Sequence, residues 1–214
     1  MHGARANLLM TATLAATIAA CNVTGEAPSF ARPPATLQPT SAAGPTRFST
    51  TAFGAPFSMT LPVGWKVRFE HPDMLFAGLD GNPETIGIDV QVVSAAAADP
   101  CVDAAGAAAI GPSAADLANW MQAWAPLKAT AGAPVTVAGR QALVVEEAFA
   151  GTPCPTANLW RTDGGYLDPS EHKRYFIFET GGTRIVATIV SQDANFAAHV
   201  DEGLAALGSL TFRP

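Results

Sequence analysis

The stretch Phe57-Ser-Met-Thr-Leu-Pro-Val-Gly-Trp65 introduces the pattern on which most of the chain is built. Its first five residues alternate apolar and polar side chains, which is the period of a strand with one buried face. Pro62 and Gly64 favour a turn, and the alternation resumes over residues 65–70. The stretch therefore predicts two strands joined by a tight turn, and strands joined in this way are antiparallel.

Further strands are indicated by the same alternation and by short turn sequences between apolar runs. The clearest is 86–92, in which every second residue is Ile or Val. The other expected strands are 74–79, 134–137, 140–149, 157–161, 175–179, 184–191 and 209–212. Most of these strands are expected to pair as hairpins.

Two helices are expected between the hairpins. Ser113 and Asp116 have the spacing of a capping box, with Asp in place of Glu, so a helix should begin at residue 114 and end at Pro126. A second helix, capped by Asp193 or Asn195, should end at Gly208. Each helix carries one apolar stripe, and the stripe must face a core.

The expected fold class is α+β, with a twisted antiparallel sheet of hairpins packed with two main helices. Placing both helices on one face of a single sheet is the most economical arrangement of these elements. The chain after its N-terminal segment is long enough for one domain with a substantial core.

The stretch 57–65, the turn Val137-Ala-Gly-Arg-Gln-Ala142 and the ending Ser209-Leu-Thr-Phe212 together resemble PsbP-like domains. The resemblance extends from about residue 57 to residue 212 and includes the two helices. It implies an α-β-α sandwich. It also implies a binding or assembly module, because PsbP-like domains share no catalytic motif.

The N-terminus resembles the leader of a bacterial lipoprotein. Arg5 is the single fixed charge before an apolar run at 8–20, and the run ends in Ile18-Ala19-Ala20-Cys21, which is similar to a lipobox. A helix of this length spans about 20 Å, which is too short for a hydrocarbon core of ~30 Å. We expect residues 1–20 to be a signal peptide and Cys21 to be lipidated. An ordinary signal peptide cut nearby is the alternative.

Residues 21–52 are expected to be the lipidated N-terminus and a tether, because Pro, Ala, Ser and Thr predominate there. The single α+β domain is expected over residues 53–214. A docked edge segment near Phe48 and Phe53 is the alternative for the end of the tether. The lipid anchor would hold the domain outside the cytoplasm at the bacterial cell membrane, or at an outer membrane if the host has one.

Cys101 and Cys154 remain as a pair once Cys21 is assigned to the lipid. Prolines flank both, and disulfides persist in an oxidising compartment, so a bridge between them is expected. A metal or thiol-redox site is the alternative, but it lacks a Cys-x-x-Cys motif and a neighbouring histidine.

Charge and histidine spacing argue against several classes of function. The formal net charge is −6, and loss of the leader removes Arg5 and makes it −7. No cluster of basic residues is evident, which argues against a nucleic-acid partner. His71, His172 and His199 do not have the spacing of metal ligands, so no metal and no cofactor are expected.

Two motifs that resemble catalytic ones lack the required context. Ser170-Glu-His-Lys173 matches Ser-x-x-Lys, but Pro169 precedes it and no Lys-Thr-Gly follows, so we interpret it as a chance match. Glu146 and Glu147 point to opposite faces of a strand and cannot form a facing acid–base pair. One of them is expected to be an inward charge on an edge strand.

Trp160, Asp163 and Tyr166 are the candidate residues for contact with a ligand or partner. Trp160 lies close to the expected disulfide and is predicted to be an exposed aromatic contact. Trp120 and Trp124 share the apolar stripe of the first helix and are assigned to the core.

The expected function is that of a membrane-anchored extracytoplasmic lipoprotein that binds an unknown envelope protein or small ligand without catalysis. A hydrophobic-ligand carrier and an envelope enzyme with an unrecognised site are the alternatives. A deep apolar cavity would favour the carrier. A cleft where polar groups with perturbed pKa values converge would favour the enzyme, and a closed core with an exposed patch would favour the binding module.

Overall fold

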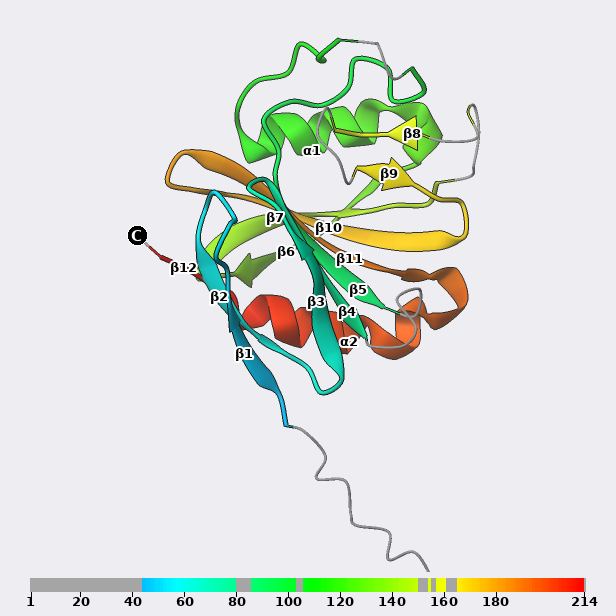
Figure 1. Ribbon diagram of the computed structural model, residues 1–214. Helices are drawn as coiled ribbons and strands as arrows, with labels where there is room; N and C mark the ends of the chain where they lie inside the picture. Colours follow the sequence, from blue (N-terminus) through cyan, green and yellow to red (C-terminus); the bar gives the residue numbers. More distant parts are fainter. Residues whose placement is uncertain are drawn as a thin grey trace, which may run out of the picture. The chain divides into compact units, whose positions relative to one another are not determined.

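The computed structural model describes residues 44–79, 86–102, 106–149, 154, 157–160 and 165–213 (Figure 1). Residues 41–214 belong to one compact unit. The described elements are β1 (Thr46–Ser49), β2 (Phe57–Leu61), β3 (Trp65–Glu70), β4 (Met74–Leu79), β5 (Gly87–Val92), α1 (Ala114–Ala123), the 3-10 turn η1 (Ala125–Leu127), β6 (Thr130–Val137), β7 (Arg140–Glu146), β8 (Ala157–Asn158), β9 (Tyr166–Leu167), β10 (Glu171–Thr180), β11 (Thr183–Gln192), α2 (Asp193–Gly208) and β12 (Thr211–Phe212).

A seven-stranded sheet forms the centre of the fold, in the order β3-β4-β5-β11-β10-β7-β6. Every neighbouring pair is antiparallel, and the β10–β11 hairpin contributes ten residue pairs. Both edge strands are irregular: β3 has a bulge between Val67 and Phe69, and β6 has one between Gly132 and Val135. The expected α+β class with an antiparallel sheet is confirmed.

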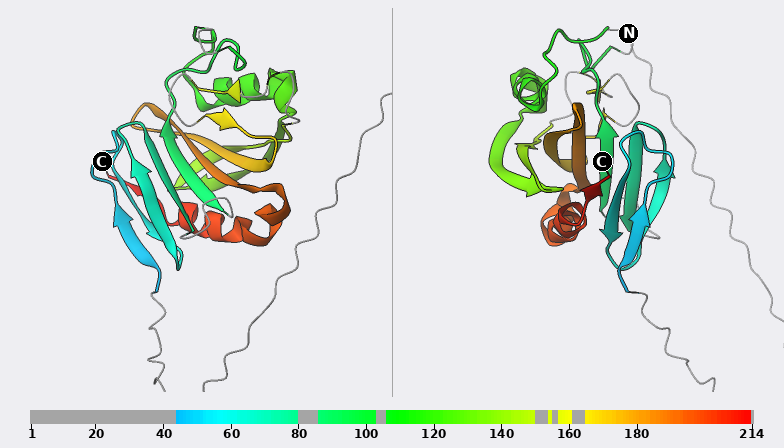
Figure 2. Two further views of the ribbon diagram at one scale, coloured as in Figure 1. Left: turned by 45° about the vertical axis from the view of Figure 1, so that its right-hand side comes forward. Right: turned by 90° about the vertical axis from the view of Figure 1, so that its left-hand side faces the viewer.

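The expected hairpin of residues 57–70 is wrong, because its two strands belong to different sheets. β2 pairs with β1 and β12 in a separate three-stranded sheet, whereas β3 pairs with β4 at the edge of the large one. Pro62 and Gly64 do form a turn, with Gly64 at a φ of 81°. The small sheet lies beside the large one (Figure 2) and buries Phe57 and Met59 in the core that they share. The apolar face of an alternating strand must be buried against another apolar surface, and either a second sheet or a helix can provide that surface.

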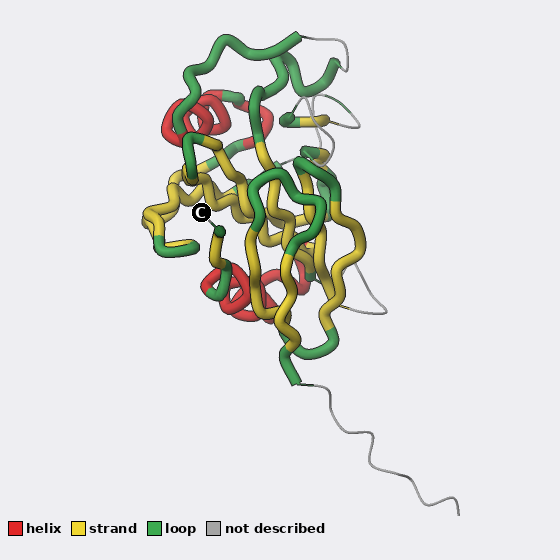
Figure 3. The backbone as a smooth tube through the Cα atoms, turned by 60° about the vertical axis from the view of Figure 1, so that its left-hand side comes forward, coloured by secondary structure: helices red, strands yellow, loops and turns green. Residues whose placement is uncertain are grey.

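The two helices pack on opposite faces of the large sheet, so the prediction of both on one face is wrong. Successive residues of β10 alternate between the two cores: Ile177 packs with Leu117 of α1, and Phe176 packs with Leu207 of α2. Figure 3 shows the two helices separated by the sheet. This is the layering that the PsbP-like motifs implied.

The start of α1 is as predicted. Ser113 Oγ accepts a hydrogen bond from the Asp116 amide at 3.1 Å, and Asp116 Oδ2 accepts one from the Ser113 amide at 3.0 Å. Helix α2 (Asp193–Gly208) ends at Gly208, as expected. Its N-cap is Gln192, which makes no capping hydrogen bond through its side chain, so the expected cap at Asp193 or Asn195 is wrong.

β1 lies inside the range expected for the tether, 21–52. All four of its residues pair with β2, and the side chain of Phe53 is 3% exposed. The structure thus has the docked edge segment that the sequence left as an alternative near Phe48 and Phe53. The expected signal peptide and Cys21 lie outside the described residues.

Candidate functional site

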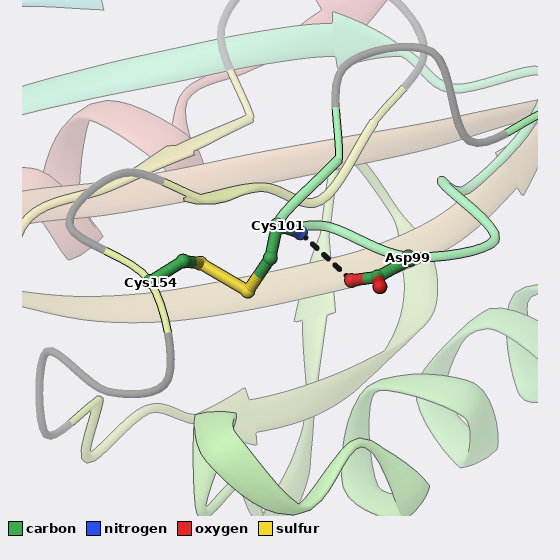
Figure 4. Close-up of a disulfide and its surroundings, with 3 residues drawn as sticks. All are labelled: Asp99, Cys101 and Cys154. Carbon is green, nitrogen blue, oxygen red and sulfur yellow. Dashed lines mark hydrogen bonds between the residues drawn. A yellow bond between two sulfur atoms is a disulfide. The ribbon is translucent and has the colours of Figure 1, made fainter.

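A disulfide joins Cys101 to Cys154, the pair expected from the sequence, with the Cα atoms 5.6 Å apart (Figure 4). Asp99 Oδ1 accepts a hydrogen bond from the Cys101 amide at 2.9 Å. Beside the bridge, the amide of Asn158 in β8 donates to the Pro100 carbonyl at 2.9 Å. The disulfide therefore fastens the segment after β5 to the segment around β8 on the α1 face of the sheet.

Trp160 is 2% exposed, so its prediction as an exposed contact is wrong. Its backbone forms a bridge with Ala96, and its ring lies edge-on to Tyr175 with centroids 6.3 Å apart. No signal in the sequence indicated that the segment containing Ala96 would pair with Trp160. Tyr166 is 56% exposed and remains a candidate contact, whereas Asp163 lies outside the described residues.

Three polar side chains are buried together beneath β9, and we call Glu147, Lys173 and Tyr175 the Glu147 cluster. Each is less than a tenth exposed. The Tyr175 hydroxyl donates to Glu147 Oε2 at 2.5 Å. Lys173 Nζ donates to the Tyr166 carbonyl and lies 2.9 Å from Glu171 Oε2. Lys173 thereby ties β10 to β9.

Burial shifts the ionisation of this cluster. It raises the pKa of Glu147 to about 7, against the opposing effects of the Lys173 charge and the Tyr175 hydrogen bond. Burial also raises the pKa of Asp89 to about 7, again opposed by Lys173. The pKa of Tyr175 rises well above its ordinary value through burial and the nearby Glu147. Two carboxyl groups on the α1 side of the sheet therefore change protonation near neutral pH.

A groove of about 480 Å³ opens at the other face of the sheet, and we call it the Arg174 groove. It runs between the ends of β6, β7 and β10 and the first turns of α2. Its lining comprises Lys128, Thr130, Glu146, Glu147, Ala148, His172, Arg174, Phe196, Ala197 and Val200. Glu147 borders the groove, but its carboxyl is buried and bonded to Tyr175.

Strand register brings the polar residues of the groove together. Thr130 pairs with Glu146, and Glu146 pairs with Arg174, so the three form a row across β6, β7 and β10. Arg174 Nε lies 2.6 Å from Glu146 Oε1, and His172 Nε2 lies 3.8 Å from Glu146 Oε2. One carboxylate therefore positions two nitrogen-bearing side chains at the groove.

Phe196 supplies an aromatic wall to the groove. Its ring is stacked on the imidazole of His172, with centroids 3.9 Å apart, and the Arg174 guanidinium carbon lies 5.5 Å from its centroid. Both distances suit interactions with the face of an aromatic ring. This site was not among those expected from the sequence. The available signal was that His172 and Arg174 are two residues apart on one strand, but their partners on β7 and α2 are remote in the chain.

Lys128 stands at the rim of the groove in the left-handed conformation, with a φ of 50°. Residues other than glycine rarely adopt this backbone conformation, and those that do often occur at functional sites. Here the conformation follows from the end of η1, where the Lys128 amide donates to the Ala125 carbonyl at 3.2 Å. This turn places an exposed lysine in the lining of the groove that also contains Arg174.

A second groove, of about 510 Å³, lies between the β2–β3 turn and α2, and we call it the Val63 groove. Most of its lining is apolar: Pro45, Thr60, Pro62, Val63, Glu202, Ala205, Ala206 and Ser209. Its acidic residue, Glu202, accepts a hydrogen bond from Trp65 Nε1 at 3.3 Å.

Among the described residues there is neither a group that could hold a metal ion nor a helix that could span a membrane. Within them, no three His, Cys, Asp or Glu residues are grouped closely enough to hold a metal ion. None of the helices described is both long and apolar enough to span a membrane.

No protein-family model matches the chain, and no curated protein sequence matches it. Among solved structures, it is similar to cyanobacterial PsbP (CyanoP) from Synechocystis sp. PCC 6803, with 13% identity and a TM-score of 0.44 over 85% of this chain and 100% of that one. It is also similar to LpqN of Mycobacterium tuberculosis, which is involved in cell envelope biogenesis, with 10% identity and a TM-score of 0.37 over 79% and 92% of the two chains.

A Bacteroides thetaiotaomicron VPI-5482 protein is similar at 13% identity with a TM-score of 0.45, over 80% of this chain. The chain spans about half the length of that protein, 49%.

Proposed function

We propose that this protein is a lipid-anchored extracytoplasmic binding module without catalytic activity, and that its partner or ligand docks in the Arg174 groove. The observation that carries the proposal is the composition of the groove. Arg174 and His172 lie against an aromatic wall there, and Lys128 lines the same groove, as in sites that orient a ligand through a few polar groups.

The placement of the perturbed carboxyl supports binding rather than catalysis. A general acid or base must come within hydrogen-bond reach of the reacting group. Glu147 has the raised pKa typical of such a residue, but it is 4% exposed and its carboxyl is bonded to Tyr175. A substrate in the groove would meet Glu146 instead, and Arg174 already occupies that carboxylate.

The extracytoplasmic location is supported by two independent features. The sequence Ile18-Ala19-Ala20-Cys21 resembles a lipobox, and Cys101 and Cys154, which are 53 residues apart, are joined by a disulfide. Disulfides persist outside the reducing cytoplasm. A diacylglyceryl group on Cys21 would provide the paired chains that stable anchoring requires.

The anchor is tested by mass spectrometry of the protein extracted from its native membrane. We expect a chain that begins at a lipid-modified Cys21, and we expect Cys21→Ser to release the protein from the membrane fraction. An uncleaved leader, or an unmodified thiol at Cys21 in the membrane-bound protein, would contradict this part of the proposal.

The groove is tested by photo-crosslinking in the native membrane, with benzoylphenylalanine placed at Val200. Val102, which is 49% exposed and is not part of the groove lining, is the matched control. We expect a discrete adduct from position 200 that is absent from position 102. Equal labelling at both positions, or labelling at neither, would refute the groove as the docking site.

The hydrophobic-ligand carrier is the second candidate, because the Val63 groove is mostly apolar and Val63 itself is 53% exposed. Displacement of a fluorescent fatty acid is the test. Binding that is lost in Val63→Asp but retained in Arg174→Gln would favour the carrier over the proposed module.

A further inference from the structure

We propose that the Arg174 groove recognises a carboxylate, carried by a small organic acid whose apolar part packs against α2. The inference rests on the proposed function of the groove and adds the chemical class of the ligand. In the bound state, the carboxylate would lie between Arg174 and Lys128, and Val200 would contact the apolar part.

The charge of the groove favours an anion. Lys128 and Arg174 bring two positive charges and Glu146 brings one negative charge, on a chain whose formal net charge is −6. The carboxyl of Glu147 is buried on the α1 side, where it faces the Lys173 and Tyr175 side chains. The groove is therefore a locally positive site on an acidic protein, and such a site concentrates anions near it.

Arg174 is suited to a carboxylate in particular. A guanidinium presents a planar fork of donors that matches the two oxygens of a carboxylate. Glu146 and the Phe196 ring hold the Arg174 side chain from two sides, at 2.6 Å and 5.5 Å. The side chain is thus ordered before the ligand arrives, which reduces the entropy cost of binding.

The remaining surface of the groove suits the rest of a small acid. Ala197 is exposed and Val200 is half-buried on the first turns of α2, beside the aromatic wall. A volume of about 480 Å³ lies within the range of small-molecule sites, roughly 300–1,000 Å³. A carboxylate with a compact apolar group therefore fits both halves of the groove.

The test is NMR titration of the folded protein with benzoate and with benzamide, its neutral counterpart of nearly the same shape. We expect benzoate to shift the resonances of Phe196 and Val200 and to bind at least about tenfold more tightly than benzamide. Arg174→Gln should weaken benzoate binding by about tenfold or more. Arg140→Gln, which removes an exposed arginine at the other end of β7, is the control and should change affinity less than about twofold.

Lys128→Gly separates recognition from folding. Glycine adopts the left-handed conformation without strain, so this variant removes a charge from the rim and should not destabilise the protein. We expect benzoate binding to weaken by about threefold or more while the melting temperature stays the same or rises.

Equal affinity for benzoate and benzamide, or unchanged benzoate affinity in Arg174→Gln and Lys128→Gly, would overturn the inference. The two proposals can fail separately. If the crosslink at position 200 persists while benzoate does not bind, the groove is a docking site for another class of ligand. If neither is observed, the groove has no binding role.

Discussion

The buried Glu147 makes stability depend on pH. Its pKa is about 7 in the folded protein and 4.5 ordinarily, so between these values the folded state binds more protons than the unfolded state. Stability must therefore fall as pH rises from about 4.5 to about 7 and then become level. Asp89, whose pKa is raised in the same direction, adds to the fall.

Glu147→Gln should remove about half of this pH dependence and leave the part that Asp89 contributes. Glutamine can still accept the Tyr175 hydrogen bond but cannot ionise. The wild-type free energy of unfolding should fall by about 3 kcal/mol more than that of the variant between pH 4.5 and pH 8. Urea denaturation at four pH values measures the difference. Asp201→Asn, an exposed acid on α2, is the control and should keep the wild-type profile. A variant with the wild-type slope would disprove the assignment.

Arg184 stabilises the fold through backbone carbonyls. It is 6% exposed and donates from Nε to the Val93 carbonyl, from Nη1 to that of Gly111, and from Nη2 to that of Ser94, at 3.0–3.2 Å. Arg184→Met leaves these acceptors unpaired and should lower the free energy of unfolding by about 3 kcal/mol. Thermal denaturation should show a marked drop in the melting temperature, and Arg140→Met should show almost none.

Sequence could not identify most of these buried charges, because their partners are remote in the chain. Arg184 bonds to a carbonyl 91 residues away. The sequence did indicate that one residue of the Glu146–Glu147 pair points inward, and Glu147 does, although β7 is an interior strand and not the expected edge. For Trp160, the sequence did not indicate that its backbone pairs with Ala96, 64 residues earlier in the chain.

At the scale of the element, the capping box of α1 can be tested alone. Ser113→Ala removes the acceptor for the Asp116 amide at the first turn of the helix. We expect a loss of about 1 kcal/mol in the free energy of unfolding. Ser49→Ala, an exposed serine in β1, is the control and should change stability by less than about 0.5 kcal/mol. If Ser113→Ala leaves the free energy of unfolding unchanged, the cap contributes no stability beyond that of the helix packing.

Local pattern predicted most elements but not their partners. The expected strands 57–61, 65–70 and 74–79 coincide with β2, β3 and β4, and α1 begins at the expected residue. The boundaries of most other expected strands differ from the observed ones by a few residues. Periodicity identifies the apolar face of an element and says nothing about which surface covers it. For this reason β2 was assigned to the wrong sheet and the two helices to a common face. The Arg174 groove depends on those long-range packings, so it could not be predicted.

For the whole molecule, the Cys101–Cys154 bridge should be the largest single covalent contribution to stability. It closes a loop with a sequence separation of 53 residues, for which the chain-entropy relation gives about 4 kcal/mol. The double variant Cys101→Ala/Cys154→Ala should lose stability of this order in urea denaturation. Reductant should lower wild-type stability similarly and leave the double variant unaffected. Equal sensitivity to reductant in both proteins would contradict the prediction.

The bulges in β3 and β6 bear on how copies of the protein behave toward one another. Regular edge strands can pair with edge strands of neighbouring molecules, and a bulge hinders such pairing because it shifts the register of the backbone amides and carbonyls relative to a straight strand. If Cys21 carries lipid, the molecules are confined to a plane, where encounters are far more frequent than in free solution. The irregular edge strands β3 and β6 would then oppose fibre formation as the protein accumulates on the membrane.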